Sequence, residues 1–118
     1  MKKVLIVDDD EGIVDSLQLL LEEFDYSVAT LMNGKAVYDL KKPYPDVILL
    51  DIWMSGIDGS DICRYLKKNK SMQHIPIIMI SANKDTAQIA REAGADDFVS
   101  KPFNFVELQE KIEKYTKK

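Results

Sequence analysis

Three consecutive aspartates, Asp8 to Asp10, follow directly after the apolar residues 4–7 in the stretch VLIVDDDEG. No basic residue separates them, and two carboxylates about 4 Å apart in a partly buried site repel by about 4 kcal/mol at an effective dielectric constant near 20. A hard divalent cation removes this repulsion. Mg²⁺ binds one or two carboxylates and completes its coordination shell with water and a phosphoryl oxygen. The pattern therefore predicts a cation site that receives a phosphate group.

Three later apolar runs also end in residues that could do chemistry. Asp51, Ser81 and Lys101 each stand at or just after the last residue of such a run. Taken alone, they are best interpreted as a solvated loop acid, a turn residue and a surface charge. In the same way, Asp10 and Glu11 are best interpreted as the cap and first turn of a helix. The remaining groups follow the ends of different strands, and together they are expected to converge on one crevice. They are Asp8, Asp9, Asp51, Ser81 and Lys101.

The apolar runs are continuous, which is typical of strands covered on both faces of a parallel sheet. The expected strands are residues 4–7, 26–30, 46–51, 75–81 and 97–100. The spacing of apolar residues predicts helices over residues 13–24, 34–42, 58–69, 84–93 and 105–115. Asp58 and either Asn83 or Ser81 are expected N-caps, and Gly94 is an expected stop. Five βα units predict a doubly wound α/β domain that binds ligands beyond the carboxyl ends of its strands.

The composition is that of a single globular domain. The chain has 118 residues, of which 46% are hydrophobic and 31% are charged. The apolar runs are too short to cross a bilayer and the first residues lack a signal peptide, so a cytoplasmic location without membrane contact is expected. The single cysteine, Cys63, excludes an intramolecular disulfide. A net charge of −4 argues against direct nucleic-acid binding, which requires clustered Lys and Arg.

The ordered motifs VDDDEG, VILLDIWMSGIDG, MISAN, AGADDF and VSKPF resemble the receiver domain of two-component response regulators over essentially the whole chain. The resemblance implies a flavodoxin-like three-layer α/β sandwich whose five-stranded parallel sheet has the order 2-1-3-4-5. It implies that Asp51 accepts a phosphoryl group from a phosphohistidine of a sensor kinase or a histidine phosphotransfer protein. It also implies bound Mg²⁺, for which Mn²⁺ can substitute. Its ligands would be Asp9 directly, Asp8 through water, Asp51, and the backbone carbonyl of Trp53.

The same resemblance implies roles for other residues at the strand ends. Ser81 matches a hydroxyl that bonds one phosphoryl oxygen, and Lys101 matches a lysine that pairs with another. The Lys101–Pro102 peptide bond is expected to be cis. Trp53 and Asn83 match positions that tune the lifetime of the phosphorylated state by shielding it from water or admitting water.

Phe98 matches the aromatic residue of a conformational switch. In the family, the hydroxyl that corresponds to Ser81 is drawn to the phosphate, and the aromatic fills the space that this opens. The surface of helix 84–93, strand 97–100 and the last helix changes as a result. Many relatives have tyrosine at this position, so Phe98 as a plain core residue stays open as the alternative. Ser55 stands where proline is usual.

The resemblance also implies the partners. Residues 1–118 are expected to be one receiver domain without an output domain. The chain would act either alone, by contact with an unknown downstream protein, or as a piece of a longer regulator. It would catalyse only its own phosphorylation and dephosphorylation, as a monomer or a phosphorylation-dependent dimer.

Two other functions remain possible from the residues. One is a phosphohydrolase of the haloacid dehalogenase type, since Asp8 and Asp10 have its spacing of nucleophile and acid. Gly12, however, stands where that family has Thr or Val, and the later acidic motif is missing. The other is a flavodoxin-like flavin binder, but DDDEG repels a phosphate unless a metal ion is bound.

Overall fold

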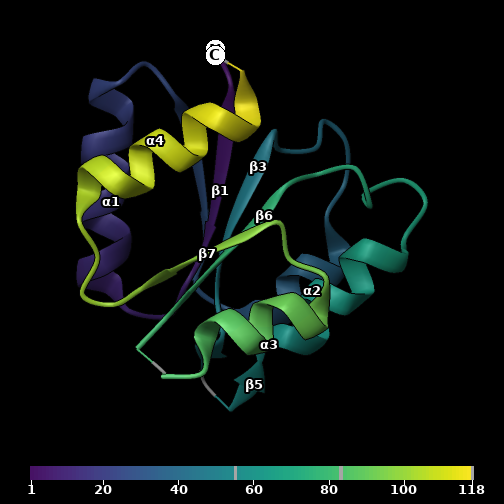
Figure 1. The fold of residues 1–118 in the computed structure, drawn as a ribbon. Coiled ribbons are helices and arrows are strands. Elements are labelled where there is room, and N and C mark those ends of the chain that lie inside the picture. The colour runs from purple at the N-terminus through teal and green to yellow at the C-terminus, as the bar shows by residue number, and fades with distance from the viewer. Residues whose placement is uncertain (55, 83, 118) are drawn as a thin grey trace.

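The computed structural model describes residues 1–54, 56–82 and 84–117, along which strands and helices alternate (Figure 1). The main strands are β1 (Lys3–Val7), β2 (Ser27–Leu31), β3 (Val47–Asp51), β6 (Ile77–Ser81) and β7 (Asp97–Ser100). The helices are α1 (Glu11–Glu23), the 3-10 helix η1 (Gly34–Asp39), α2 (Gly59–Lys68), α3 (Thr86–Ala93) and α4 (Phe105–Thr116). A short pair, β4 (Trp53–Met54) and β5 (Ile57–Asp58), lies between β3 and α2.

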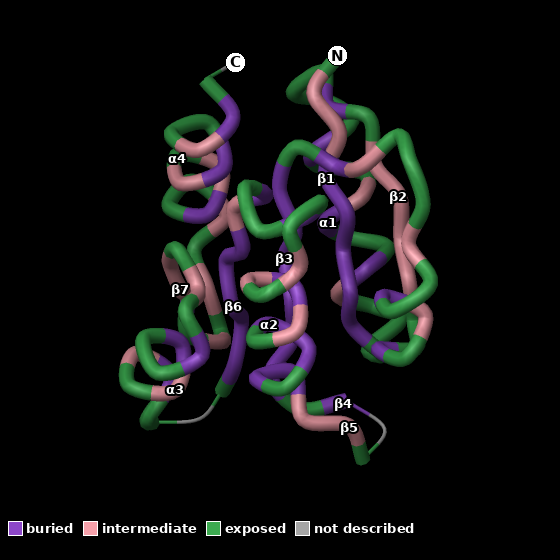
Figure 2. Tube along the Cα trace, turned by 90° about the vertical axis from the view of Figure 1, so that its right-hand side faces the viewer, coloured by how far each residue is buried: buried purple, intermediate pink, exposed green. Residues whose placement is uncertain are grey.

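The main strands form one parallel, five-stranded sheet in the order β2-β1-β3-β6-β7. Counted by βα units this is the order 2-1-3-4-5, so the predicted flavodoxin-like sheet is confirmed. Asp51 lies opposite Ile80, and Ser81 lies opposite Ser100. The carboxyl ends of the strands therefore meet at one edge of the sheet. Both chain termini lie toward the opposite edge, at the top of Figure 2.

The sheet is covered on both faces, which confirms the predicted three layers. Helices α1 and α4 cover one face, and η1, α2 and α3 cover the other. In β1, Val4 and Ile6 pack into the core beneath α1 and α4, whereas Leu5 and Val7 pack into the core beneath η1, α2 and α3. The central strands are therefore buried along most of their length (Figure 2), which explains why their apolar runs are continuous.

Aspartate caps begin two of the helices, as predicted. Asp10 Oδ1 accepts a hydrogen bond from the Ile13 amide at 3.2 Å at the start of α1. Asp58 Oδ1 accepts one from the Ser60 amide at 2.8 Å at the start of α2. Each carboxylate satisfies an amide that has no partner within its helix, which is why these residue types favour helix starts.

The predicted cap of α3 is wrong. Asp85 occupies the N-cap position. Ser81 is instead the last residue of β6, where its extended backbone pairs with β7. Asn83, the other expected cap, lies outside the described residues. The predicted stop is confirmed, since Gly94 ends α3 with a left-handed φ of 86° that favours glycine.

The helix predicted over residues 34–42 is shorter than expected. Only Gly34–Asp39 is helical, as a 3-10 helix, and Leu40 has an extended ψ of 137°. Pro43 disfavours helical backbone at the residue before it, which limits the C-terminal end of the helix. At its N-terminal end the helix packs closely on α2, because a Cβ on Gly34 would lie 2.8 Å from Ile62 Cδ1.

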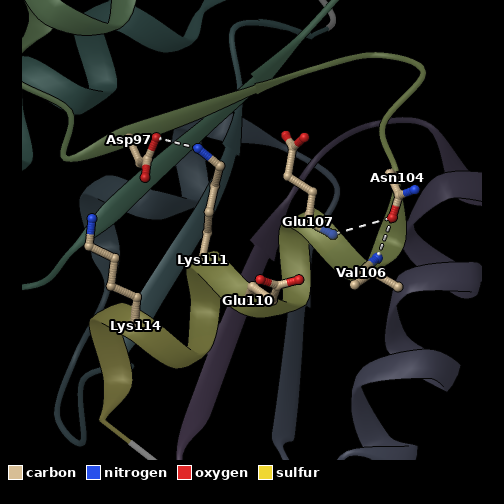
Figure 3. A pocket seen from close by; sticks show the side chains of 7 residues that line it. All are labelled: Asp97, Asn104, Val106, Glu107, Glu110, Lys111 and Lys114. Atoms are coloured by element: carbon tan, nitrogen blue, oxygen red, sulfur yellow. Dashed lines mark hydrogen bonds and ion pairs between the residues drawn. The ribbon is translucent and has the colours of Figure 1, made fainter.

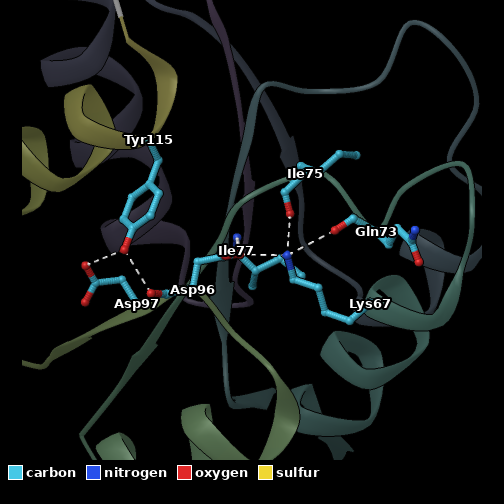
Figure 4. A network of polar contacts seen from close by, with 7 residues as sticks. All are labelled: Lys67, Gln73, Ile75, Ile77, Asp96, Asp97 and Tyr115. Carbon is cyan, nitrogen blue, oxygen red and sulfur yellow. Dashed lines mark hydrogen bonds and ion pairs between the residues drawn. The ribbon is translucent and has the colours of Figure 1, made fainter.

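A polar network joins α2, β6 and α4 near the amino ends of β6 and β7 (Figure 4). Lys67 Nζ donates to the Ile75 carbonyl at 2.9 Å and to Asp96 Oδ2 at 2.7 Å. The same carboxylate oxygen accepts the Ile77 amide at 2.8 Å, and the Tyr115 hydroxyl donates to the Asp96 carbonyl at 2.9 Å. The network fixes α2 and α4 to the edge of the sheet that lies away from the converging side chains.

Candidate functional site

The carboxylates of Asp8, Asp9 and Asp51 form one cluster at the carboxyl edge of the sheet. Asp8 and Asp9 follow β1, and Asp51 ends β3, its neighbour in the sheet. One oxygen of each carboxylate lies within 4.8 Å of the others. Asp8 and Asp51 are only 1% and 6% exposed, whereas Asp9 is exposed. The structure thus brings together the three expected carboxylates, while their role as metal ligands stays a prediction.

Lys101 faces this cluster from the end of β7. Its Nζ lies 3.2 Å from Asp8 Oδ2 and 3.7 Å from Asp51 Oδ1. The Lys101 amide donates to the Ser81 carbonyl at 2.8 Å, which fixes the base of the side chain. The Lys101–Pro102 bond is cis, as the resemblance implied. The Lys101 ammonium can balance at most one of the three carboxylate charges.

The surroundings of Asp51 disfavour its ionised form. Burial raises the pKa of Asp51 to about 6 from an ordinary value of 3.8, and repulsion by the Asp8 carboxylate adds to the shift, while Lys101 opposes it. Most of the Asp51 side chain is still ionised at neutral pH. A buried carboxylate of this kind is stabilised by a nearby cation or by protonation.

Asp10 does not join the cluster, because its carboxylate caps α1. The Asp10 amide instead donates to Asp8 Oδ1 at 2.9 Å, which helps to orient the Asp8 side chain. The hydrolase alternative required Asp10 as a second catalytic carboxylate beside Asp8. Since the Asp10 carboxylate accepts the Ile13 amide, the geometry does not favour that alternative.

Ser81 ends the strand next to Asp51. Because Asp51 lies opposite Ile80, Ser81 is one residue nearer the carboxyl edge of the sheet. The residue is 4% exposed. The role of its hydroxyl as a phosphate ligand stays a prediction.

Trp53 lies on β4, two residues beyond Asp51. It is 55% exposed, and its backbone pairs with that of Asp58 in the short antiparallel ladder. Its expected role in tuning the lifetime of the phosphorylated state stays a prediction. Asn83, the other residue expected to tune the lifetime, and Ser55 both lie outside the described residues.

Phe98 lies on β7, half-buried against the core beneath α2 and α3. Lys111 Nζ of α4 lies 5.7 Å from the centroid of its ring and donates to Asp97 Oδ1 at 2.8 Å. Partial burial is compatible with both open interpretations, a switch residue and a plain core residue.

The loop after Asp51 contains structure that the sequence pattern did not reveal. Trp53 pairs with Asp58 and Met54 pairs with Ile57, and Gly56 in the turn between them has a φ of 76°. Strands of two residues are too short to produce a periodic signal. The available signal was the dipeptide Ser55-Gly56 in the sequence, since Ser-Gly pairs are typical of turns.

Comparison with known proteins shows the family to which the chain belongs. The family model for the response regulator receiver domain matches residues 4–113. The alkaline phosphatase synthesis transcriptional regulatory protein PhoP of Bacillus subtilis is 37% identical over 114 residues, which cover 94% of this chain and 47% of PhoP. The chain spans about half the length of such curated relatives.

Solved structures agree over nearly the whole chain. A putative response regulator from Chloroflexus aurantiacus has a TM-score of 0.89 and 31% identity, covering 99% of this chain and 98% of its own. The response regulator TrrA of Thermotoga maritima, in complex with Mg(2+)-BeF, has a TM-score of 0.86 and 34% identity, covering 98% and 99%. The chain therefore belongs to the response regulator receiver domain family, whose members are the phosphoacceptor domains of two-component systems.

Proposed function

We propose that transfer of a phosphoryl group from a phosphohistidine to Asp51 switches this receiver domain between two signalling states. The observation that carries the proposal is the meeting of three carboxylates and the Lys101 ammonium at one edge of the sheet. Of the clustered carboxylates, Asp51 is the proposed nucleophile because it ends the central strand β3 and lies beside both Lys101 and the end of β6.

The cluster suits a magnesium ion. Asp8, Asp9 and Asp51 offer hard oxygen donors within 4.8 Å of one another, and the Trp53 carbonyl is the proposed backbone ligand. When bound, Mg²⁺, or Mn²⁺ in its place, neutralises negative charge on the carboxylates and on the phosphoryl oxygens. The Mg(2+)-BeF complex of the similar protein TrrA supports this assignment.

The chemical step requires alignment and charge neutralisation rather than a base. A carboxylate oxygen of Asp51 bonds to phosphorus as the bond from phosphorus to the donor's imidazole nitrogen breaks, and that nitrogen keeps the electron pair. The transition state is loose and disperses charge over the phosphoryl oxygens. Lys101, 3.7 Å from Asp51, pairs with one of these oxygens, and the Ser81 hydroxyl donates to another. No base is needed, because most Asp51 is ionised at neutral pH.

The proposed output surface is formed by α3, β7 and α4. Movement of the Ser81 hydroxyl toward the phosphate would change the space available to Phe98 on the neighbouring strand. Asp97, the sequence neighbour of Phe98 on β7, and side chains of both charges on α4 line a hollow of about 730 Å³ (Figure 3). Because phenylalanine has no hydroxyl group, Phe98 would transmit the change by shape alone.

The proposed phosphodonor is a sensor histidine kinase or a histidine phosphotransfer protein. We propose that residues 1–118 form one receiver domain, whose signal passes to a downstream protein or to an output domain in a longer polypeptide. The net charge of −4 argues against direct contact with nucleic acid. No helix in the described ranges is both long and apolar enough to cross a bilayer.

Incubation with acetyl phosphate or phosphoramidate and Mg²⁺, followed by intact-mass measurement, tests the proposal without a kinase. Wild type should gain one phosphoryl group, and Asp51→Asn should not. Asp61→Asn is the matched control, because Asp61 is exposed and pairs with Arg64 on α2. An adduct that persists in Asp51→Asn, or no adduct in wild type, contradicts the proposal.

A further inference from the structure

Gly59 begins α2 directly against the backbone that follows the proposed phosphoacceptor. Its amide donates to the carbonyl of Ile52. The residue before it, Asp58, pairs with Trp53 across the ladder of β4 and β5. The backbone that carries Asp51 and Trp53 is therefore held from one side by residues 58–59.

The contact at Gly59 is too close for any side chain. A Cβ built there would overlap the Asp51 carbonyl oxygen and would lie 2.9 Å from Ile52 Cα and 3.0 Å from the Ile52 carbonyl oxygen. All of these are backbone atoms of β3 and the residue after it, so no flexible side chain can move aside. Gly59 is not among the glycines with positive φ, so its requirement is one of space rather than of backbone conformation.

We propose that Gly59 is a positioning residue for the phosphoacceptor site. Its close contact sets the path of the backbone from Asp51 to Trp53, and hence the directions of the Asp51 carboxylate and the Trp53 carbonyl. The inference rests on the proposed function, in which both groups are Mg²⁺ ligands. Mg²⁺ demands near-ideal octahedral geometry, and functional groups must be held within about 0.5 Å of their working positions. A methyl group at residue 59 would push the end of β3 away from α2 and disturb both ligands.

The substitution Gly59→Ala tests this role, with Gly12→Ala as its matched control. Gly12 also lies in the first turn of a helix that begins beside the acidic cluster. Among the described residues, however, a Cβ on Gly12 would meet nothing nearer than Asp10 Oδ1, at 3.5 Å. Mg²⁺ affinity is measured from Trp53 fluorescence and by calorimetry, and phosphorylation by acetyl phosphate is followed by intact mass. Gly59→Ala should weaken Mg²⁺ binding by about tenfold or more, as loss of residues that support metal ligands does. Gly12→Ala should behave like wild type.

The outcomes separate this inference from the proposed function. A folded Gly59→Ala protein whose Mg²⁺ affinity and phosphorylation rate equal those of Gly12→Ala overturns the inference and leaves the proposed function intact. A wild-type protein that neither binds Mg²⁺ nor accepts a phosphoryl group overturns both.

If Gly59→Ala does not fold, the variant Asp58→Ala tests the inference instead. Asp58→Ala removes the carboxylate that accepts the Ser60 amide, and so loosens the start of α2 without adding an atom beside Asp51. Its control is Asn104→Ala, which removes the equivalent cap of α4. Weaker Mg²⁺ binding in Asp58→Ala than in Asn104→Ala supports the inference, and equal binding overturns it.

Discussion

The ammonium of Lys101 lies 3.2 Å from the carboxylate of Asp8. Asp8 follows β1 and Lys101 follows β7, and two strands, β3 and β6, lie between β1 and β7 in the sheet. Asp8 is almost completely buried, so its charge is stabilised mainly by what touches it. Lys101 and a bound metal ion would therefore share the neutralisation of Asp8. This predicts that the effect of removing the amine depends on magnesium.

Lys101→Met should lower the free energy of unfolding in Mg²⁺-free buffer by about 3 kcal/mol, because a buried charge that loses its partner is strongly destabilising. Mg²⁺ should restore more stability to this variant than it adds to wild type. Urea unfolding with EDTA and with Mg²⁺ measures both effects, and Lys114→Met on α4 is the control. If Lys101→Met loses the same stability with EDTA and with Mg²⁺, Lys101 and the metal ion do not share the neutralisation of Asp8.

The raised pKa of Asp51 predicts a specific dependence of stability on pH. Since the pKa is about 6 in the folded protein and 3.8 ordinarily, the folded state binds this proton more tightly. The resulting stabilisation is complete below pH 3.8 and is lost as the pH rises through about 6. Its size is on the order of 3 kcal/mol.

Asp51→Asn should therefore be more stable than wild type above about pH 6 without Mg²⁺, and the two should converge in acid. Urea unfolding in EDTA across this pH range measures the difference in the free energy of unfolding between the two proteins. Taking this difference cancels the contributions of most other titrating groups. Asp61→Asn should show no such trend. A difference between Asp51→Asn and wild type that stays constant with pH contradicts the shift.

The main sheet and the cluster could be predicted because their signals are local. Each strand is a continuous apolar run, and parallel strands must end at one edge, so Asp8, Asp51 and Lys101 were expected to meet. Their distances and the raised pKa of Asp51 depend on burial, which sequence spacing does not contain. The strand order came from the family resemblance, because apolar periodicity does not order strands.

The errors lie where several local signals compete or where tertiary packing decides. Ser81, Asn83 and Asp85 are all good cap residues within five positions. Ser81 is excluded only because its backbone pairs with β7, which is a tertiary fact. Likewise, no spacing in the sequence predicts that Gly59 is crowded against the Asp51 carbonyl, which is visible only in three dimensions.

Lys111 links α4 to β7 beside Phe98, and this link should strengthen the fold at neutral pH. Burial alone would raise the pKa of Asp97, but hydrogen bonds from Lys111, the Phe98 amide and Tyr115 together lower it below 3.8. A lowered pKa stabilises the fold above that value, and the stabilisation is lost as the pH falls. Lys111→Met should cost about 1 kcal/mol at neutral pH and less in acid. Urea unfolding at neutral pH and in acid measures this loss of stability, with Lys114→Met as the control. A loss in Lys111→Met that is equally large in acid contradicts the prediction.

Trp53 should lengthen the lifetime of the phosphorylated state by limiting the access of water to Asp51. Its side chain is 55% exposed two residues beyond Asp51, so Trp53→Ala should change stability by less than about 1 kcal/mol. The phosphoryl group on Asp51 should nevertheless hydrolyse several-fold faster in this variant, as measured by decay of the intact-mass adduct after the phosphodonor is removed. Trp53→Phe keeps most of the bulk and should keep most of the lifetime. An unchanged lifetime in Trp53→Ala rules out shielding, whereas equal losses in both variants would mean that the indole acts by something other than its bulk.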